Sequence, residues 1–415
     1  MMSEIKQRIE QIRRGEVPER YVKTALGLAP ANWKRYTFGD IYTQRKEPGD
    51  ENLPLLMVSI HSGVSDGEVD AAELPKQVKR IEDKSQYKKA VSGDLVFNMM
   101  RAWQGAIGTV RTTGMVSPAY IVAEPNGKAY PLFMDYYSRT PQMINQIDRQ
   151  SYGVTDFRKR LYWDSFAPIG CILPPIAEQQ KIAAILTTQD KVIELKEKRL
   201  AEKQRQKKYL MQQLLTGKKR LPGFNGAWKT DCLGKLFFER KETNCENIEM
   251  LAITGTQGII PRKELDLKDN SSEDKSKYLR VCVGDIGYNT MRMWQGVSAY
   301  SNYEGIVSPA YTILKPSSSI NAKYFAYLFK MSEIVFLFYR FSQGLVDDTR
   351  NLKYENFKKI KVCYPPDMKE QTAIAEVLSA ADREIDLLQQ DIEQEKQKKK
   401  ALMQLLLTGI VRVKT

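Results

Sequence analysis

The most constraining feature of this sequence is that it contains the same segment twice. The run Asn-x-Met-Arg-x-Trp-Gln-Gly occupies residues 98–105 and returns at residues 289–296, a shift of 191 positions. Aligned without gaps, residues 93–120 and 284–311 are identical at 14 of 28 positions. A long match at one period marks a structural unit that occurs twice. The chain is therefore expected to fold into two similar domains.

Each copy begins with a region that has the pattern of a compact domain. In residues 30–175 and 225–366, short β-branched or aromatic runs alternate with Gly, Pro and Asn, as in successive short strands. The segments 131–150 and 322–341 are the expected helices, because Pro141 is the only residue that interrupts them. Each domain is therefore predicted to be α+β.

A long helix is expected after each domain. Both Pro-Pro pairs, at 174–175 and 365–366, precede a run without proline or glycine that ends in Thr-Gly at 216–217 and 408–409. Apolar residues recur there at alternating four- and three-residue spacing, which is typical of a coiled coil. The expected seam consists of Ile182, Leu186, Ile193, Leu200, Leu210 and Leu214 in the first helix, and Ile374, Leu378, Ile385, Leu388, Ile392, Leu402 and Leu406 in the second.

Antiparallel pairing of these two helices would place one domain at each end, with pseudo-twofold symmetry from the internal duplication. The alternative is that each helix packs on its own domain. That alternative is less favoured, because a helix of this length spans roughly 58 Å, which exceeds the diameter of a small domain.

These features divide the chain into five segments. Ile5, Ile9 and Ile12 have helical spacing, and we expect a short helix there to pack where the C-terminal helix ends. The segments are an N-terminal helical segment 1–25, a first domain 26–175, a central helix 176–217, a second domain 218–366 and a C-terminal helix 367–415.

The charge of the chain indicates a polyanionic partner. There are 64 Lys and Arg against 50 Asp and Glu, a net charge of +14. Each phosphate that a protein neutralises releases condensed counterions, so nucleic acid is the leading partner. The apolar runs are too short to span a membrane, and the charged N-terminus lacks a signal-peptide core, which together predict a cytoplasmic protein.

Residues for catalysis or metal binding are scarce. His61 is the only histidine, and the five cysteines never form a Cys-x-x-Cys pair, so no metal site is expected. No Gly-x-x-x-x-Gly-Lys-Ser/Thr loop is present for ATP. The segment Tyr364-Pro365-Pro366-Asp367 lacks both flanking residues of the Asp/Asn-Pro-Pro-Tyr element of adenine methyltransferases. We therefore expect no catalytic site on this chain.

The duplicated motifs resemble those of a known family. Gly-Asp, Asn-x-Met-Arg-x-Trp-Gln-Gly, Val-Ser-Pro-Ala-Tyr and Pro-Pro-x-x-Glu-Gln, followed by a long helix that ends in Leu-Leu-Thr-Gly, are similar to the specificity subunit of type I restriction-modification systems. The resemblance covers nearly the full chain. It implies two target-recognition domains, each of which reads one half of a bipartite site in double-stranded DNA across an unread spacer.

The same resemblance implies partners that carry the chemistry. Two modification subunits would bind S-adenosylmethionine and methylate adenine. Restriction subunits would use ATP and Mg²⁺ to translocate and cleave DNA. This chain would bind none of these cofactors itself.

The repeated motif contains the residue types that read base edges. Arg and Gln form bidentate hydrogen bonds to guanine and adenine in the major groove, which makes Arg101, Gln104, Arg292 and Gln295 candidate readers. The further candidate contacts are Asn98, Asn289, Arg158, Arg160 and Arg350.

The alternative to base reading is that the motif forms a scaffold turn, in which Trp103 and Trp294 fill the core and Arg and Gln satisfy backbone groups. Loops that differ between the copies are then better placed to set the target sequence. They are 61–79 against 257–277, and 155–160 against 346–350.

A second class of function also fits the pattern. A coiled-coil structural or interaction protein with two protein-binding domains would show the same duplication. The positive charge weighs against it, and sequence-dependent DNA binding would separate the two.

Overall fold

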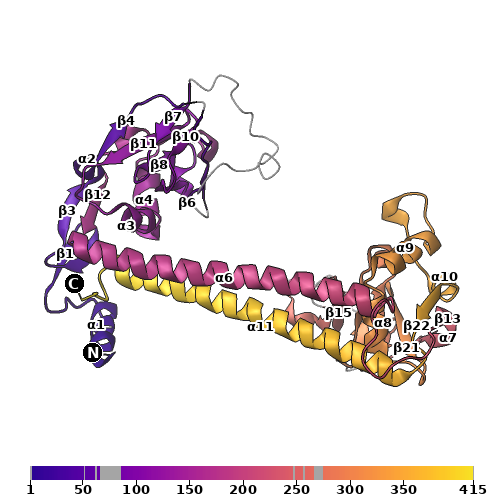
Figure 1. Ribbon diagram of the computed structural model, residues 1–415. Coiled ribbons are helices and arrows are strands. Elements are labelled where there is room, and N and C mark those ends of the chain that lie inside the picture. The colour runs from indigo at the N-terminus through magenta and orange to yellow at the C-terminus, as the bar shows by residue number, and fades with distance from the viewer. Residues whose placement is uncertain are drawn as a thin grey trace. The chain divides into compact units, whose positions relative to one another are not determined.

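The computed structural model describes residues 2–50, 52–60, 63–65, 86–245, 248–255, 258–265 and 274–414 (Figure 1). The chain divides into two compact units. Unit 1 contains residues 1–195 and 392–415, and unit 2 contains residues 196–391.

The domain of unit 1 contains an antiparallel four-stranded sheet with the order β4-β11-β8-β9. Its strands are β4 (Tyr42–Arg45), β8 (Leu95–Asn98), β9 (Ile107–Thr109) and β11 (Tyr120–Pro125). Three strand pairs accompany it: β3 (Lys34–Thr37) with β12 (Gly170–Leu173), β7 (Lys88–Ala90) with β10 (Gly114–Val116), and β5 (Val58–Ser59) with β6 (Gly63–Val64). Short helices α2 (Phe38–Ile41) and α5 (Trp163–Phe166) complete the domain.

Unit 2 repeats this topology. Its four-stranded sheet has the order β14-β21-β18-β19, with β14 (Phe237–Glu239), β18 (Ile286–Asn289), β19 (Ser298–Tyr300) and β21 (Tyr311–Pro316). The strand pairs are β13 (Lys229–Cys232) with β22 (Lys361–Tyr364), β17 (Leu279–Val281) with β20 (Gly305–Val307), and β15 (Leu251–Thr254) with β16 (Gly258–Pro261). Its short helices are α7 (Leu233–Leu236) and α10 (Tyr354–Phe357).

Equivalent aromatic side chains form the two cores. Phe97 packs on Phe166 in unit 1, with ring centroids 4.6 Å apart. Tyr288 stacks on Phe357 at the equivalent positions of unit 2, at 5.6 Å. All four side chains are fully buried. The expectation of two similar α+β domains is confirmed.

The helices inside each domain are broken, whereas the sequence analysis expected an interruption only at Pro141. Segment 131–150 forms α3 (Pro131–Tyr137) and α4 (Pro141–Arg149), and segment 322–341 forms α8 (Ala322–Leu328) and α9 (Ser332–Phe341). Pro141 explains the first break, since proline favours the first position of a new helix. The second break contains no proline. Phe329 is buried there, and its ring packs edge-on against Phe338 of α9 at 5.4 Å, so core packing decides the break.

The two long helices are α6 (Ile176–Leu214) and α11 (Met368–Leu407), and both run through unit 1 and unit 2. In unit 1, Gln189 of α6 donates a hydrogen bond to the carboxylate of Glu395 at 2.6 Å. In unit 2, Lys196 pairs with Asp391 at 2.8 Å and Lys203 with Glu384 at 2.9 Å. Residue numbers rise along α6 as those of its partners fall along α11, so the helices are antiparallel in unit 2, as expected.

The predicted seam residues are buried to different degrees. Those at the helix ends join the domain cores: Ile182, Leu186 and Leu406 in unit 1, and Leu214, Ile374 and Leu378 in unit 2. Each helix therefore packs on a domain as well as on the other helix, so the alternative that the sequence analysis disfavoured also holds. Ile193, Ile385 and Ile392 are buried, whereas Leu200, Leu210, Leu388 and Leu402 are partly buried.

The N-terminal segment differs from the helical segment 1–25 that the sequence predicted. Helix α1 (Met2–Arg13) ends early, and a β-hairpin follows, formed by β1 (Tyr21–Thr24) and β2 (Gly27–Pro30). The helix does meet the end of α11, because Arg8 donates to the carbonyl of Ile410 at 3.2 Å. Tyr21 of the hairpin donates to the carbonyl of Gly409 at 2.7 Å.

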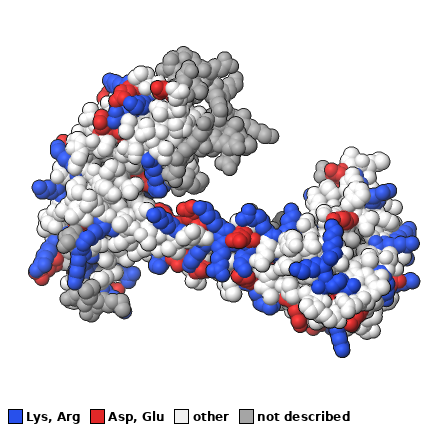
Figure 2. Space-filling view, viewed as in Figure 1, with Lys and Arg blue, Asp and Glu red and all other residues white. Residues whose placement is uncertain are grey.

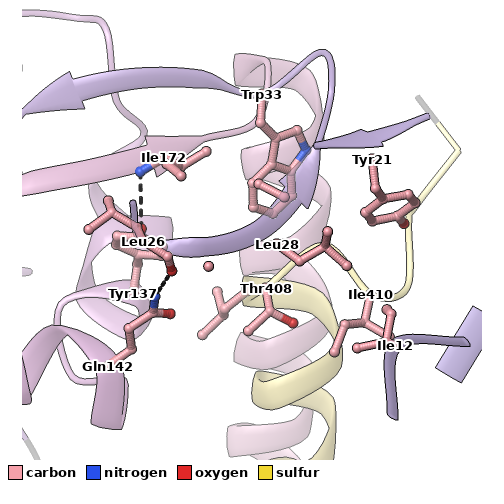
Figure 3. A pocket seen from close by; sticks show the side chains of 13 residues that line it. Ile12, Tyr21, Leu26, Leu28, Trp33, Tyr137, Gln142, Ile172, Thr408 and Ile410 are labelled. Atoms are coloured by element: carbon pink, nitrogen blue, oxygen red, sulfur yellow. Dashed lines mark hydrogen bonds between the residues drawn. The ribbon is translucent and has the colours of Figure 1, made fainter. Parts of the chain in front are cut away.

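The N-terminal hairpin and the segment at the end of α11 enclose a cavity of about 250 Å³ in unit 1 (Figure 3). The hairpin side chains Leu26 and Leu28 line it together with Trp33 and Ile410. Figure 3 also shows Gln142 of α4, whose amide donates to the backbone carbonyl of Leu26. The hairpin is therefore attached both to the first domain and to the end of α11.

An ion pair of the same kind closes each unit. In unit 1, Arg412 donates to both oxygens of Glu178, at 2.6 and 2.7 Å. In unit 2, Arg220 contacts Glu370 at 2.5 and 2.7 Å. Both carboxylates are buried. The segment after each long helix is thereby fixed to the start of the other one.

Candidate nucleic-acid interface

The repeated Gly-Asp motif forms a buried ion pair in each domain. Asp94 accepts from Arg45 Nε at 2.7 Å and from the backbone N–H of Val91 at 2.8 Å. Asp285 accepts from Arg240 Nε at 2.7 Å in the same way. Burial raises the pKa of Asp94, and the hydrogen bonds from Arg45 oppose that shift. In unit 1 this ion pair connects the end of β4 to the segment before β8. In unit 2 it connects the end of β14 to the segment before β18.

The motif Asn-x-Met-Arg-x-Trp-Gln-Gly forms a tight turn after β8, which we call the Trp-Gln-Gly turn (98–105 in unit 1 and 289–296 in unit 2). Asn98 Oδ1 accepts from the backbone N–H of Met100 at 2.8 Å, and Trp103 Nε1 donates to the carbonyl of Met100 at 3.0 Å. The single turn η2 (Ala102–Gln104) ends at Gly105 with φ +104°, a conformation that favours glycine.

Unit 2 builds the turn from the same contacts. Asn289 Oδ1 accepts from the N–H of Met291 at 3.0 Å, and Trp294 Nε1 donates to the carbonyl of Met291 at 2.9 Å. The turn η5 (Met293–Gln295) ends at Gly296 with φ +80°. Asn98 and Asn289 therefore stabilise the backbone of the turn through Oδ1, and their contact with DNA stays a prediction.

The arginine and glutamine of the motif have a different environment. Arg101, Gln104, Arg292 and Gln295 are exposed, and none has a side-chain hydrogen bond or ion pair within the described part of the chain. The scaffold interpretation expected these side chains to satisfy backbone groups, and the structure gives them no such role. It also expected the tryptophans to fill the core, whereas Trp103 and Trp294 are only partly buried. Asn, Trp and Gly build the turn, while Arg and Gln face solvent.

A second loop is attached to each turn, and we call it the tip loop (151–161 in unit 1 and 342–352 in unit 2). In unit 1, the N–H of Leu161 donates to the carbonyl of Met99 at 2.8 Å. Lys159 pairs with Asp148 at 2.8 Å, and its Nζ lies 4.7 Å from the ring centroid of Trp103. The hydrogen bond from Lys159 to Asp148 raises the pKa of that lysine. The loop is thereby fixed beside the tryptophan.

The tip loop of unit 2 is fixed by equivalent residues. Leu352 N–H donates to the carbonyl of Thr290 at 2.8 Å. Arg350, at the position of Lys159, lies 4.0 Å from the ring centroid of Tyr339 and pairs with Asp347 at 3.3 Å. Tyr339 in turn packs edge-on against Trp294.

The predicted contact residues of these loops fall into two groups. Arg158 is exposed and has no side-chain partner among the residues described. Arg160 is partly buried, and its guanidinium donates to the carbonyl of Lys159 at 2.9 Å. Arg350 is engaged by Tyr339 and Asp347, so it holds the loop and has less freedom to reach a base.

Most of the longer variable loops lie outside the described residues. This applies to most of 61–79, including His61, and to residues 257 and 266–273 of the second loop. In the described residues, no cluster of three or more His, Cys, Asp or Glu side chains is arranged to hold a metal ion. No helix among them is long and apolar enough to cross a membrane.

The sequence analysis missed one feature of the tip loops. Val154 is 93% exposed, and Leu345, its equivalent in unit 2, is 100% exposed. The available signal was an aliphatic residue directly after the repeated glycines Gly153 and Gly344. A search for polar base readers passes over such residues.

Charge is distributed differently over the helices and the turns. Figure 2 shows Lys and Arg alternating with Asp and Glu along the face of the long helices that it presents. Between the two helices, Lys203 pairs with Glu384 and Lys399 with Asp190. Cations on the helices are thus largely neutralised by neighbours, whereas Arg101 and Arg292 on the turns lack such neighbours among the described residues.

Two copies of one α+β domain, each with an exposed Arg-Gln pair on a rigid turn, define a duplicated DNA-recognition protein. A family model described as the type I restriction modification DNA specificity domain matches residues 76–205 and 234–397. These matches cover more than half of the chain, which therefore belongs to the family of type I restriction-modification DNA specificity subunits. The resemblance inferred from the motifs is confirmed, and the protein-binding alternative is not favoured.

The chain is similar to a protein of Methanocaldococcus jannaschii that is described as a type I restriction enzyme MjaX specificity subunit. The two are 23% identical over 441 residues, which cover 96% of this chain and 98% of the relative. The crystal structure of the type I restriction-modification S subunit from M. genitalium has a TM-score of 0.55 at 12% identity, covering 92% of this chain and 97% of that one. A chain from a structure of type I R-M complex assembly and conformational transition has a TM-score of 0.53 at 16% identity, covering 92% and 99%.

Proposed function

We propose that each domain reads one half of a bipartite site in double-stranded DNA, with the Trp-Gln-Gly turn as part of the contact surface. The observation that carries this proposal is the exposed arginine–glutamine pair, which occurs on the same rigid turn in both units. Arginine and glutamine have the donors and acceptors that match guanine and adenine edges in the major groove. A turn that is already ordered loses little entropy on binding.

Exchange of one domain tests this proposal directly. Replacing residues 26–175 with the equivalent domain of a relative is expected to change one half of the target and leave the other half unchanged, because each unit has its own core. The modified sites of cells that express the hybrid and its partners would be mapped. The matched control exchanges residues 218–366 and should alter only the other half. A hybrid that changes both halves would contradict independent reading.

Arg101→Ala and Arg292→Ala test the turn itself. If each arginine contacts a base, its loss is expected to cost about 1–3 kcal/mol and to relax the sequence preference at one position of one half-site. Binding to duplexes with single base changes would measure this. Arg20→Ala removes an exposed arginine from the N-terminal segment and serves as the control for charge. Uniform weakening on all duplexes would instead assign these arginines to phosphate contacts.

We further propose that the chain has no catalytic activity and acts through two modification subunits and through restriction subunits. S-adenosylmethionine, ATP and Mg²⁺ would bind to those partners. Leu195 and Leu387 support two equivalent docking sites for modification subunits, since each is 65% exposed and they occupy matching positions on α6 and α11. We also propose that the complex acts in the cytoplasm.

A further inference from the structure

The tip loops expose aliphatic side chains at equivalent positions of the two units. Val154 is 93% exposed and Leu345 is 100% exposed. Single exposed aliphatic residues are common on protein surfaces, so exposure alone means little. These two are unusual because the surrounding loop is built to hold them in place.

The backbone of each tip loop is closely packed behind the exposed residue. A Cβ on Gly153 would lie 2.5 Å from the carbonyl carbon of Arg158, and one on Gly344 would lie 2.7 Å from the backbone of Arg350. Gly344 also has φ +136°, which side chains rarely adopt. Antiparallel bridges close both loops, between Tyr152 and Arg160 in unit 1 and at the equivalent place in unit 2. The aliphatic side chain therefore extends from a rigid support.

The aliphatic side chain of each tip lies close in sequence to an aspartate that is already paired with a cation. The residues that follow are Thr155 and Asp156 in unit 1, and Val346 and Asp347 in unit 2. The carboxylates of Asp156 and Asp347 are 69% and 66% exposed, and each pairs at 3.3 Å with the cation three residues later, Lys159 or Arg350. Arg158 is the exposed arginine of the unit 1 tip loop, and Arg101 and Arg292 are exposed on the attached Trp-Gln-Gly turns. The aliphatic side chain at each tip offers no hydrogen-bond donor to a phosphate, so a base edge inside a groove is the part of DNA that it matches.

An aliphatic side chain has one distinctive partner among the base edges, the C5-methyl group of thymine. That methyl lies in the major groove, which is about 12 Å wide and admits a protein element, whereas the minor groove is about 6 Å wide. We propose that Val154 and Leu345 each contact a thymine methyl in the major groove and add a thymine preference at one position of their half-site. This inference depends on the proposed function, reading of one half-site by each unit.

Deoxyuridine tests the contact, because it differs from thymidine only by that methyl. Selection from a pool of random-sequence duplexes by the full chain with its modification subunits first gives the preferred site. Each thymine is then replaced by deoxyuridine in turn. Burial of one methyl contributes enough that wild-type binding is expected to fall about three- to fivefold at one position per half-site. Val154→Ser should abolish the difference in the first half-site only, and Leu345→Ser in the second only.

Val22→Ser is the matched control, since Val22 is an exposed valine of the N-terminal hairpin. It should retain the wild-type response to deoxyuridine at both positions. The inference is overturned if no deoxyuridine duplex binds more weakly, if Val154→Ser keeps the wild-type response, or if it weakens all duplexes equally. Failure of the proposed function has a different signature, because selection by the wild-type complex would then enrich no sequence.

Discussion

Arg45→Met is expected to destabilise unit 1 by about 3–5 kcal/mol, because it leaves the carboxylate of Asp94 buried without its cation. Asp94 is 1% exposed, and the backbone N–H of Val91 would still donate to its carboxylate. A domain typically has only about 5–15 kcal/mol of stability, so this loss is severe. Hydrogen exchange measured by mass spectrometry, which resolves unit 1 from unit 2, would give the two free energies of opening.

The loss should also depend on pH. Burial already raises the pKa of Asp94, and Arg45 opposes that shift, so removing Arg45 raises this pKa further. The folded variant then holds a proton that the unfolded chain releases, and stability falls as the pH rises from the unfolded to the folded pKa. The deficit of Arg45→Met is therefore expected to be larger at about pH 8 than at about pH 5.

Two further variants make this prediction specific. Arg240→Met removes the equivalent cation and should destabilise unit 2 while leaving unit 1 unchanged. Adding Asp94→Asn to Arg45→Met removes the buried charge and should recover much of the stability. An equal loss at both pH values, or a loss in both units, would show that the buried carboxylate is not the cause.

Arg412→Met is expected to lower the free energy of unfolding of unit 1 by about 3 kcal/mol, because it removes the cation from the buried carboxylate of Glu178. Glu178 is 1% exposed, and Trp33 Nε1 would still donate to it at 3.3 Å. The first amides to lose protection from hydrogen exchange should be those of the C-terminal tail and of the start of α6.

Arg220→Met is the internal control for this second experiment. It removes the equivalent cation from Glu370 and should weaken unit 2 instead. In unit 2 the segment after α6 continues directly into β13 of the domain, whereas in unit 1 the segment after α11 is far in sequence from the domain that it contacts. The unit 1 variant should therefore release its tail more completely. Equal exchange of both tails would contradict a role for the ion pair in holding the terminus.

The sequence alone was sufficient for the duplicated architecture and the family. The shift of 191 residues identified two copies, and the absence of proline and glycine up to each Thr-Gly pair identified α6 and α11. The predicted C-terminal helix 367–415 was too long, because α11 ends at Leu407, just before Thr408-Gly409. These properties are local or repetitive, so they can be recognised without knowledge of which residues meet in space.

Contacts between distant segments could not be predicted in this way. The break between α8 and α9 follows from burial of Phe329 against Phe338, which overrides a segment with good helical propensity. The β1–β2 hairpin begins within the predicted helical segment 1–25 and ends beyond it. It is held by the carbonyl of Gly409, which follows α11, and by α4 of the first domain.

At the candidate interface, too, the sequence determined some features and the tertiary structure determined others. Sequence identified the repeated Asn-x-Met-Arg-x-Trp-Gln-Gly motif, but both a scaffold and a base-reading role fitted it. Tertiary structure separated the roles within the motif, because Asn98 and Trp103 bond to the backbone of the turn while Arg101 and Gln104 are left exposed. The direction of a side chain depends on the φ and ψ angles of a turn that ends at a left-handed Gly105, and on the tip loop packed behind it. Periodicity determined which residues recur, and packing determined which of them face solvent.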